Sequence, residues 1–219
     1  MPRALFEKKG RAVWISHLDL MRLFQRAFKR ANLHLTHTQG YNQRPSVSIA
    51  LPLSVGVESN CELIDFNLEG QQIDSQQICD RLNDALVDGI RVLTVYDNGR
   101  KLRELALLSC KVYLIYDNGV PQQAQEAIAQ LFSRESVIAP KKTKSGIQDQ
   151  DLIPMIRRIS VEQVDDKRLC LNALVCCQNP TLNPAQLILA IGMYLPQFKP
   201  DHSVCERIEV YDMKENIFR

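Results

Sequence analysis

The sequence predicts an α+β protein built from two ferredoxin-like (βαββαβ) units packed side by side. Hydrophobic patterns give the order strand, helix, strands, helix, strand in residues 1–98 and give it again in residues 99–219. The tetrapeptide Tyr-Asp-Asn-Gly follows a predicted strand in two places, at residues 96–99 and 116–119. An Arg- and Lys-containing stretch at residues 99–107 separates the two patterns, so we expect domain boundaries of 1–98 and 99–219.

The first unit is expected to hold two amphipathic helices. Apolar residues recur at helical spacing from Asp19 to Ala31, and either Ser16 or Asp19 can cap the start of this helix. A second helix runs from Ser75 to Leu86, before Gly89. Residues 11–15 follow the first strand as a possible hairpin partner, across a Lys8-Lys9-Gly10 turn. The predicted extended segments of this unit lie at residues 3–8, 11–15, 33–37, 47–53, 61–68 and 90–96.

The second unit repeats this order. Pro121 opens a helix that buries Ala124, Ile128, Leu131 and Phe132, because proline is favoured in a first turn. Another helix is expected from Asn183 or Pro184 to Leu195. We expect a long polar loop after the short strand 136–139. The remaining predicted strands are 108–116, the two that flank the Asp165-Asp166-Lys167 turn, and 205–211.

Composition indicates a globular protein without a cofactor site that can be identified from sequence. The chain has 219 residues, 45% of them apolar, which is enough to bury a sizeable core. No apolar run approaches the ~20 residues that span a bilayer, and the first residues do not resemble a secretion signal. The seven cysteines favour a reducing compartment, so we expect a cytoplasmic protein. Cys176 and Cys177 are adjacent on a predicted strand and point to opposite faces, which favours packing over metal binding.

Residues 16–59 contain the best candidates for a working surface. His17 could act as a general base near neutral pH, and Asp19 two residues later could orient it. The same two residues are equally compatible with a structural role, in which Asp19 caps the helix and His17 bonds to the backbone. The sequence leaves both interpretations open.

Positive charge follows one face of the first helix and continues into the next loop. This stripe can contact phosphates, or it can be a solvated helix face. The loop that follows has an aromatic side chain for stacking on a base, although a plain turn with a packed tyrosine remains an alternative. Lys141, Lys142 and Lys144 form a third basic segment, either a phosphate contact or a mobile connection. The predicted RNA- or anion-binding residues are Arg22, Arg26, Lys29, Arg30, His37, Gln39, Tyr41, Asn42 and Arg44.

These motifs resemble a bacterial family of unknown function known as radical-SAM-linked or radical-SAM-associated. The resemblance rests on Ser16-His17-Leu18-Asp19-Leu20, Gln39-Gly40-Tyr41-Asn42, Arg44-Pro45 and the segment 50–59, and it is weaker in Asp151-Leu152-Ile153-Pro154. The chain departs from the family pattern at Gln43, where proline is usual, and at Ile153, where arginine is usual. The resemblance implies a B12-binding radical SAM protein as partner. The chain has no Cys-x-x-x-Cys-x-x-Cys run to hold a cluster, so it is not that radical enzyme.

Two classes of function are therefore expected. The first is an accessory module that binds tRNA or another structured RNA and acts with the radical SAM enzyme. The second is a metal-independent RNA-processing enzyme with His17 as base or acid, Asp19 as its orienter, and Arg44 or Lys29 as the anion stabiliser. A protein-only scaffold for the radical SAM partner is a further alternative.

Overall fold

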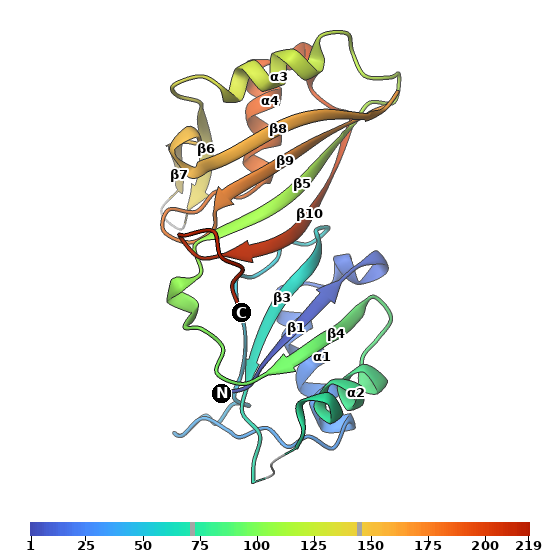
Figure 1. The fold of residues 1–219 in the computed structure, drawn as a ribbon, viewed down its shortest axis with the longest axis vertical. Coiled ribbons are helices and arrows are strands. Elements are labelled where there is room, and N and C mark those ends of the chain that lie inside the picture. The colour runs from blue at the N-terminus through green and yellow to red at the C-terminus, as the bar shows by residue number, and fades with distance from the viewer. Residues whose placement is uncertain (71–72, 144–145) are drawn as a thin grey trace. The chain divides into compact units, whose positions relative to one another are not determined.

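The computed structural model describes residues 1–70, 73–143 and 146–219, and these residues form two compact units (Figure 1). Unit 1 comprises residues 1–102 together with Arg219, and unit 2 comprises residues 103–218. Both units are α+β with antiparallel sheets, which confirms the predicted fold class. Among the described residues no helix is long and apolar enough to cross a membrane.

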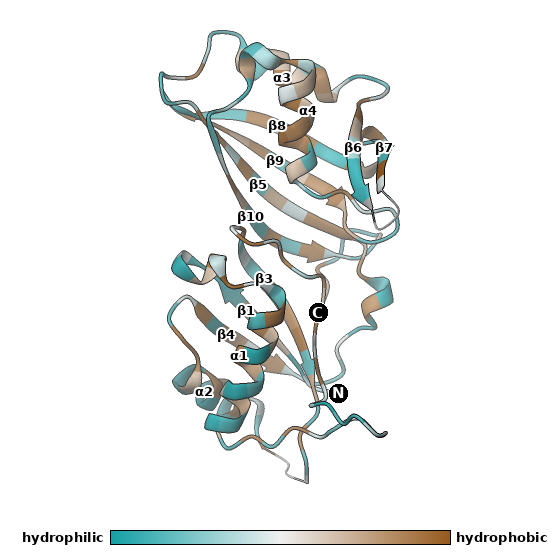
Figure 2. Cartoon of the chain, turned by 180° about the vertical axis from the view of Figure 1, so that it is seen from behind, coloured by the Kyte–Doolittle hydropathy of each residue, from teal (hydrophilic) through white to brown (hydrophobic). Residues whose placement is uncertain are grey.

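Unit 1 has the strand order of a ferredoxin-like sheet. Its strands lie in the order β4-β1-β3, and β2 pairs with β3 on the far side. Two helices lie on one face of this sheet, as Figure 2 shows from behind. The elements are β1 (Arg3–Lys8), η1 (Gly10–Trp14), α1 (His17–Arg30), β2 (Val47–Ile49), β3 (Glu58–Phe66), α2 (Ser75–Ala85) and β4 (Ile90–Tyr96).

The core of unit 1 lies between the helices and the sheet. Phe24 on α1 meets Phe6 on β1 edge to face, with ring centroids 4.7 Å apart. Phe28 packs against Phe66 of β3 with the two rings tilted and their centroids 4.9 Å apart. Leu82 of α2 is fully buried in this cluster. This packing fixes which side of α1 faces the core and which side remains available to a ligand.

Unit 2 repeats the order with one insertion. Its sheet runs β10-β5-β9-β8, which is again fourth, first, third and second strand of a ferredoxin-like unit. The additional hairpin β6-β7 is inserted between the first helix and β8. The elements are η2 (Leu102–Glu104, at the boundary), β5 (Leu107–Ile115), α3 (Ala124–Phe132), β6 (Ile138–Thr143), β7 (Gly146–Asp151), η3 (Ile153–Met155), β8 (Ile156–Asp165), β9 (Arg168–Cys176), α4 (Ala185–Tyr194), η4 (Pro196–Phe198) and β10 (His202–Tyr211).

Several local predictions were wrong, each for a physical reason. Residues 11–15 do not pair as a strand, because residues 10–14 form the short 3-10 helix η1. The strand expected at 47–53 ends at Ile49, and Leu51 adopts a positive φ of 50°. The long polar loop expected after residue 139 is the rest of the hairpin β6-β7, whose second strand is polar and mostly exposed. Such strands lack the alternating apolar pattern by which a half-buried strand is recognised.

The repeated tetrapeptide does not mark equivalent positions. Its first copy follows β4, which is the fourth strand of unit 1. The second copy follows β5, which is the first strand of unit 2. The two copies are therefore turn-forming sequences at strand ends that do not correspond, and they are not a trace of duplication.

Candidate nucleic-acid interface

The first turn of α1 is fixed by Ser16 and Asp19. The Ser16 hydroxyl accepts a hydrogen bond from the backbone N–H of Asp19 and donates to Asp19 Oδ2 at 2.8 Å. Arg22 Nη1 lies 3.1 Å from Asp19 Oδ1. The hydrogen bond from Ser16, followed by that from Arg22, lowers the pKa of Asp19 below its ordinary value. Asp19 is thus a carboxylate that caps the positive end of the helix dipole.

His17 lies on a different side of α1 from Asp19. At about 100° per residue, the two side chains are roughly 160° apart around the helix axis. The same spacing places His17 in line with Phe24, which is fully buried. His17 Nδ1 is buried, and it has no hydrogen-bond partner within the described part of the chain. The structure therefore does not bring His17 and Asp19 together, and the catalytic role of this pair stays a prediction.

Three arginines of α1 line one groove. Arg22, Arg26 and Arg30 follow one another at four-residue spacing, so their Cα atoms rise by about 6 Å per step along the helix. The groove has a volume of about 390 Å³. This arginine groove is lined by Ile15, Asp19, Arg22, Leu23, Arg26, Arg30 and Val87.

Charge in the arginine groove is predominantly positive. Asp19 is its single carboxylate, and it is paired with Arg22. Arg30 donates to the carbonyl of Ala85 at the end of α2 and so keeps its full charge. Arg26 has no ion pair or hydrogen bond in the described ranges, and its side chain is exposed. Lys29 is exposed on the same helix without lining the groove.

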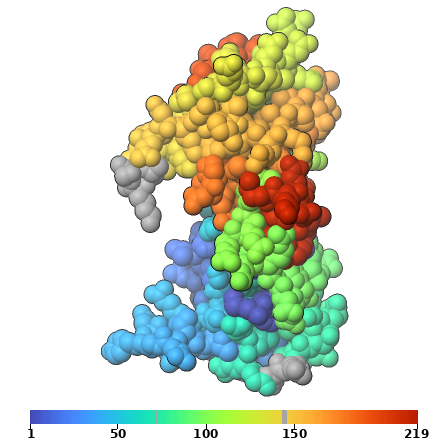
Figure 3. All heavy atoms as spheres, turned by 60° about the vertical axis from the view of Figure 1, so that its left-hand side comes forward, coloured from blue at the N-terminus to red at the C-terminus, as the bar shows by residue number. Residues whose placement is uncertain are grey.

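The loop after α1 projects from unit 1 as an arm, the light-blue lobe in Figure 3. The arm loop, residues 37–45, is closed at its base by a bridge between His37 and Pro45 and by hydrogen bonds between Thr38 and Arg44. Its tip is exposed and holds the predicted residues Gln39, Tyr41 and Asn42.

The Tyr41 ring is fully exposed, which excludes the interpretation as a packed turn tyrosine. Gly40 at the tip has a φ of +128°, a backbone conformation in which any residue with a side chain would be strained. His37 Nδ1 lies 3.9 Å from Glu69 Oε1, and both side chains are about half exposed. The arm therefore presents one aromatic ring and the Arg44 side chain to solvent on a defined base.

The third basic segment does not form a lysine cluster among the described residues. Lys141 Nζ donates to the carbonyl of Thr181 at 2.9 Å, so this lysine ties β6 to the segment before α4. Lys142 is exposed. Lys144 and Ser145, also part of the predicted segment, lie outside the described residues.

Sequence reasoning missed a second hollow, on the sheet of unit 2. This sheet hollow has a volume of about 540 Å³. Its residues come from the four strands β5, β8, β9 and β10, and the strand register brings them together. The one sequence signal was the polar alternation of Ser109 and Lys111 within an otherwise apolar strand. The hollow is lined by Ser109, Cys110, Lys111, Arg158, Ile159, Ser160, Asn172, Ala173, Leu174, Ile208 and Tyr211.

Comparison with protein-family models gives one assignment. Residues 2–184 match the model of DUF2344, described as an uncharacterized protein conserved in bacteria. The chain belongs to this family. The expectation of an uncharacterised bacterial family is thereby confirmed, whereas the association of this family with radical SAM proteins stays a prediction. A comparison with curated protein sequences gave no match.

Comparison with solved structures shows a likeness in fold to a chain of one complex at a TM-score above 0.5, and a weaker match that carries no argument. A chain of the "Crystal Structure of a Cbf5-Nop10-Gar1 Complex" matches with a TM-score of 0.54 at 12% identity, over 95% of this chain and 48% of that chain. The DUF2344 chain thus spans about half the length of that structural relative. The "Crystal Structure of an Unknown Protein from Galdieria sulphuraria" matches at 10% identity with a TM-score of 0.26, over 94% of this chain and 96% of that one.

Proposed function

We propose that this DUF2344 protein binds RNA through unit 1 and serves as an accessory protein of a B12-binding radical SAM enzyme. The arginine groove holds phosphates of the RNA backbone, and the arm loop contacts a neighbouring nucleotide. In this role the protein presents a tRNA or another structured RNA for modification. It does not carry out the radical chemistry itself.

One observation carries the RNA proposal: three guanidinium groups line one groove that contains a single carboxylate. A guanidinium presents several N–H donors in a planar fork that matches phosphate oxygens. Because Arg22, Arg26 and Arg30 are spaced by one helical turn each, they form a row rather than a point charge. A row of cations suits a polymer of phosphates better than it suits an isolated anion.

The arm loop supports the same ligand class. Tyr41 is exposed at the tip, and Arg44 adds positive charge to the arm. An exposed aromatic ring next to cations is the arrangement by which proteins stack unpaired bases while contacting the backbone. An exposed tyrosine that packs against nothing has no structural role in the free protein, which favours a role in binding.

The radical SAM partner rests on the resemblance of the Ser16–Leu20 and Gln39–Asn42 motifs. Both motifs lie on unit 1, the first at the start of α1 and the second at the tip of the arm loop. A partner enzyme that acts on RNA would need its substrate held and oriented. An accessory protein with a phosphate-binding groove supplies that without a catalytic group of its own.

The alternative of an RNA-processing enzyme has less support from the geometry. That mechanism needs Asp19 to orient His17, yet Asp19 is engaged by Ser16 and Arg22. His17 is also in line with the buried phenylalanines of α1. A protein-only scaffold is the outcome that remains if no RNA is found on the protein.

The direct test is capture of RNA from the native cell. The tagged protein is crosslinked with ultraviolet light, bound RNA is sequenced, and co-purifying proteins are identified. Arg22→Glu with Arg26→Glu should lose the enriched RNA class, while Arg81→Glu with Arg91→Glu, two exposed arginines of unit 1 outside the arginine groove, should keep it. A radical SAM protein without RNA above background would contradict the RNA proposal and leave the scaffold.

A further inference from the structure

The sheet hollow of unit 2 lies on the face of the sheet that the helices do not cover. On β5, Cys110, Val112 and Leu114 are buried on the helix side, while Ser109 and Lys111 alternate with them. Successive side chains of a strand point to opposite faces, so Ser109 and Lys111 belong to the other face.

Strand register arranges the hollow as two parallel rows of side chains. One row holds Lys111, Asn172 and Ser160, and the other holds Ser109, Leu174 and Arg158. Neighbouring strands are about 4.8 Å apart and residues two apart on a strand are about 6.6 Å apart, so the rows cover about 10 Å by 7 Å. This footprint fits a flat heterocycle of one or two fused rings. The volume of about 540 Å³ falls within the range of ordinary ligand sites.

The charges at the hollow are balanced, which argues against an anion as its main ligand. Arg158 Nη1 lies 2.5 Å from Glu215 Oε2. Lys111 is directly opposite Glu206 in the pairing of β5 with β10. Each cation thus has a carboxylate nearby, and a phosphate would have to compete with it. A neutral ligand with polar edges meets no such competition.

The polar groups of the hollow suit the edge of such a ligand. Asn172 presents both a donor and an acceptor, and its Nδ2 is held 2.8 Å from Glu162 Oε1. Ser160 is exposed beside it on β8. Ser109 Oγ is buried and has no hydrogen-bond partner in the part of the chain that the structure describes. This hydroxyl leaves unused hydrogen-bonding capacity at the floor of the hollow.

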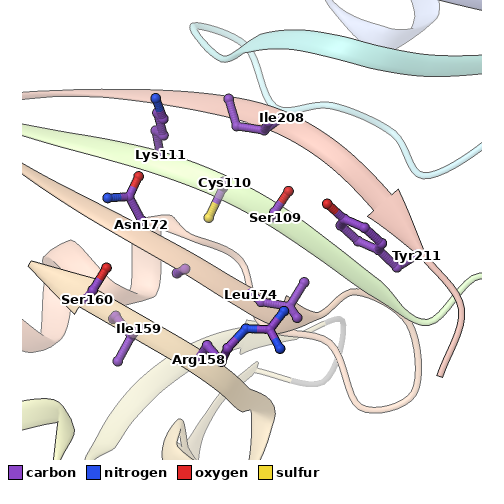
Figure 4. Close-up of a pocket in the computed structure, with 11 residues that line it drawn as sticks. Ser109, Cys110, Lys111, Arg158, Ile159, Ser160, Asn172, Leu174, Ile208 and Tyr211 are labelled. Atoms are coloured by element: carbon purple, nitrogen blue, oxygen red, sulfur yellow. The ribbon is translucent and has the colours of Figure 1, made fainter. Parts of the chain in front are cut away.

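Apolar and aromatic side chains complete the surface. Leu174 of β9 is buried, and Ile208 and Tyr211 of β10 line one side of the hollow. Figure 4 shows Asn172 and Ser160 toward one end of the hollow and Tyr211 toward the other. A ring placed on Leu174 and against Tyr211 would present its polar edge to Asn172.

We propose that the sheet hollow binds a nucleobase, presented by an unpaired nucleotide of the RNA. This inference rests on the proposed function, because it names the part of the RNA that unit 2 takes. The hollow lies open on a sheet surface, so a base within a strand can reach it as readily as a free nucleotide. Bases in a duplex are stacked and paired, and their faces are not available to it.

The test fills the hollow with a bulky side chain. Ser160→Trp adds an indole at the hollow, and Val164→Trp, four residues along the same strand and outside the hollow, is the matched control. Both positions are exposed on β8, so both variants should fold. Binding is measured by fluorescence anisotropy with a labelled 12-nucleotide single-stranded RNA and with a duplex RNA of equal length.

We expect Ser160→Trp to weaken binding of the single strand by about tenfold, the scale of one lost base-stacking contact, and to leave the duplex unaffected. The Val164→Trp protein should match the unsubstituted protein with both probes. Equal affinities of the two variants for the single strand would overturn the inference, while loss of binding in Arg22→Glu/Arg26→Glu would still uphold the proposed function.

A second arm keeps the inference testable if RNA does not bind at all. Free AMP and UMP are titrated into isotopically labelled protein, and backbone amide shifts are followed by NMR. Shifts at residues 109–111, 158–160 and 172–174 that Ser160→Trp abolishes would support a nucleobase site independent of RNA. Absence of these shifts, together with absence of any effect of Ser160→Trp on RNA, contradicts it.

Discussion

The two units share one strand order but expose different surfaces. In unit 1 the helix α1 is amphipathic and carries Arg22, Arg26 and Arg30 on its outer side, whereas α4 of unit 2 is apolar along most of its length (Figure 2). The two units also differ on the sheet face that lies away from the helices. Unit 1 buries an ion pair there, and unit 2 has the sheet hollow. The same topology therefore offers a helix surface in one unit and a sheet surface in the other.

This contrast predicts two kinds of contact for the proposed RNA ligand. The arginine groove is built on charge, so its contribution should depend on salt and not on sequence. The sheet hollow has balanced charge and directional polar groups, so its contribution should depend on an unpaired base and little on salt. Variants in each unit can test these structural differences separately.

The largest expected effect is loss of the core that holds α1 on its sheet. Phe24→Ala removes a fully buried ring and its edge contact with Phe6. The free energy of unfolding should fall by about 3–5 kcal/mol, as for other buried Phe→Ala changes. Urea denaturation measures it, with Leu18→Ala as control, because Leu18 on the same helix is 66% exposed. Similar losses in both variants would contradict the packing of α1 described above.

The buried ion pair of unit 1 gives the next effect. The Arg3 guanidinium donates to both carboxylate oxygens of Asp65, and the two side chains are 4% and 12% exposed. Burial alone would lower the pKa of Arg3, but hydrogen bonding and attraction to Asp65 outweigh it and raise that pKa. Arg3→Met should cost about 3 kcal/mol, because it leaves Asp65 without its cation.

The double change Arg3→Met with Asp65→Leu separates the pair from its burial. Removing both charges should restore part of the unfolding free energy that Arg3→Met loses, since an uncharged residue at position 65 has no charge to desolvate. Chemical denaturation of Arg3→Met, Asp65→Leu and the double variant, each compared with the unsubstituted protein, gives the coupling free energy between the two residues. A double variant as unstable as the sum of both single variants would show that the pair does not act as a unit.

The arm loop should contribute less to RNA binding than the arginine groove. Tyr41→Ala removes one stacking ring, and the expected loss of affinity for single-stranded RNA is about fivefold. Because the ring is fully exposed in the free protein, stability should stay within about 0.5 kcal/mol. Tyr41→Phe keeps the ring and should bind normally, which distinguishes stacking from a hydroxyl contact. Equal weakening in both variants would argue against stacking.

The smallest effect concerns the hairpin β6-β7 that is inserted in unit 2. Burial would raise the pKa of Asp151 at the end of β7, but the backbone N–H groups of Val137 and Ile153 donate to it and lower that pKa. A carboxyl with a depressed folded-state pKa contributes stability above its unfolded pKa and loses it as pH falls through the folded value. Asp151→Asn should therefore cost about 1 kcal/mol near neutral pH and less in acid. A constant difference across the acid range, measured by denaturation, would rule this out.

The fold could be predicted because apolar residues recur at helix or strand spacing in most elements of both halves. Ile90–Tyr96 was predicted at its observed bounds, and Ser16 was one of the two cap candidates named from sequence for α1. The end of β6 and the whole of β7 were missed, since β7 is polar and mostly exposed and has no buried apolar face. The apolar pattern was traced from Asp19 to Ala31, and α1 begins at His17, the start that follows from the Ser16 cap.

The candidate site was predictable only where it is local in sequence. The four-residue spacing of Arg22, Arg26 and Arg30 lies within one helix, so a helical pattern is enough to align them. The sheet hollow needs Ser109, Asn172 and Ser160 to be neighbours across three strands. Strand register depends on the whole sheet, and no single segment of the sequence specifies it.

The measurement that tests the central claim most directly is the salt dependence of RNA binding. Affinity for a single-stranded RNA is measured over a range of salt concentrations for Arg22→Gln/Arg26→Gln and for the control Arg81→Gln/Arg91→Gln. Two lost phosphate contacts should reduce the slope of log affinity against log salt by about 1.4, and the control should keep the slope of the unsubstituted protein. Identical slopes for both double variants, or no RNA binding by the unsubstituted protein, would contradict the claim that the arginine groove holds RNA.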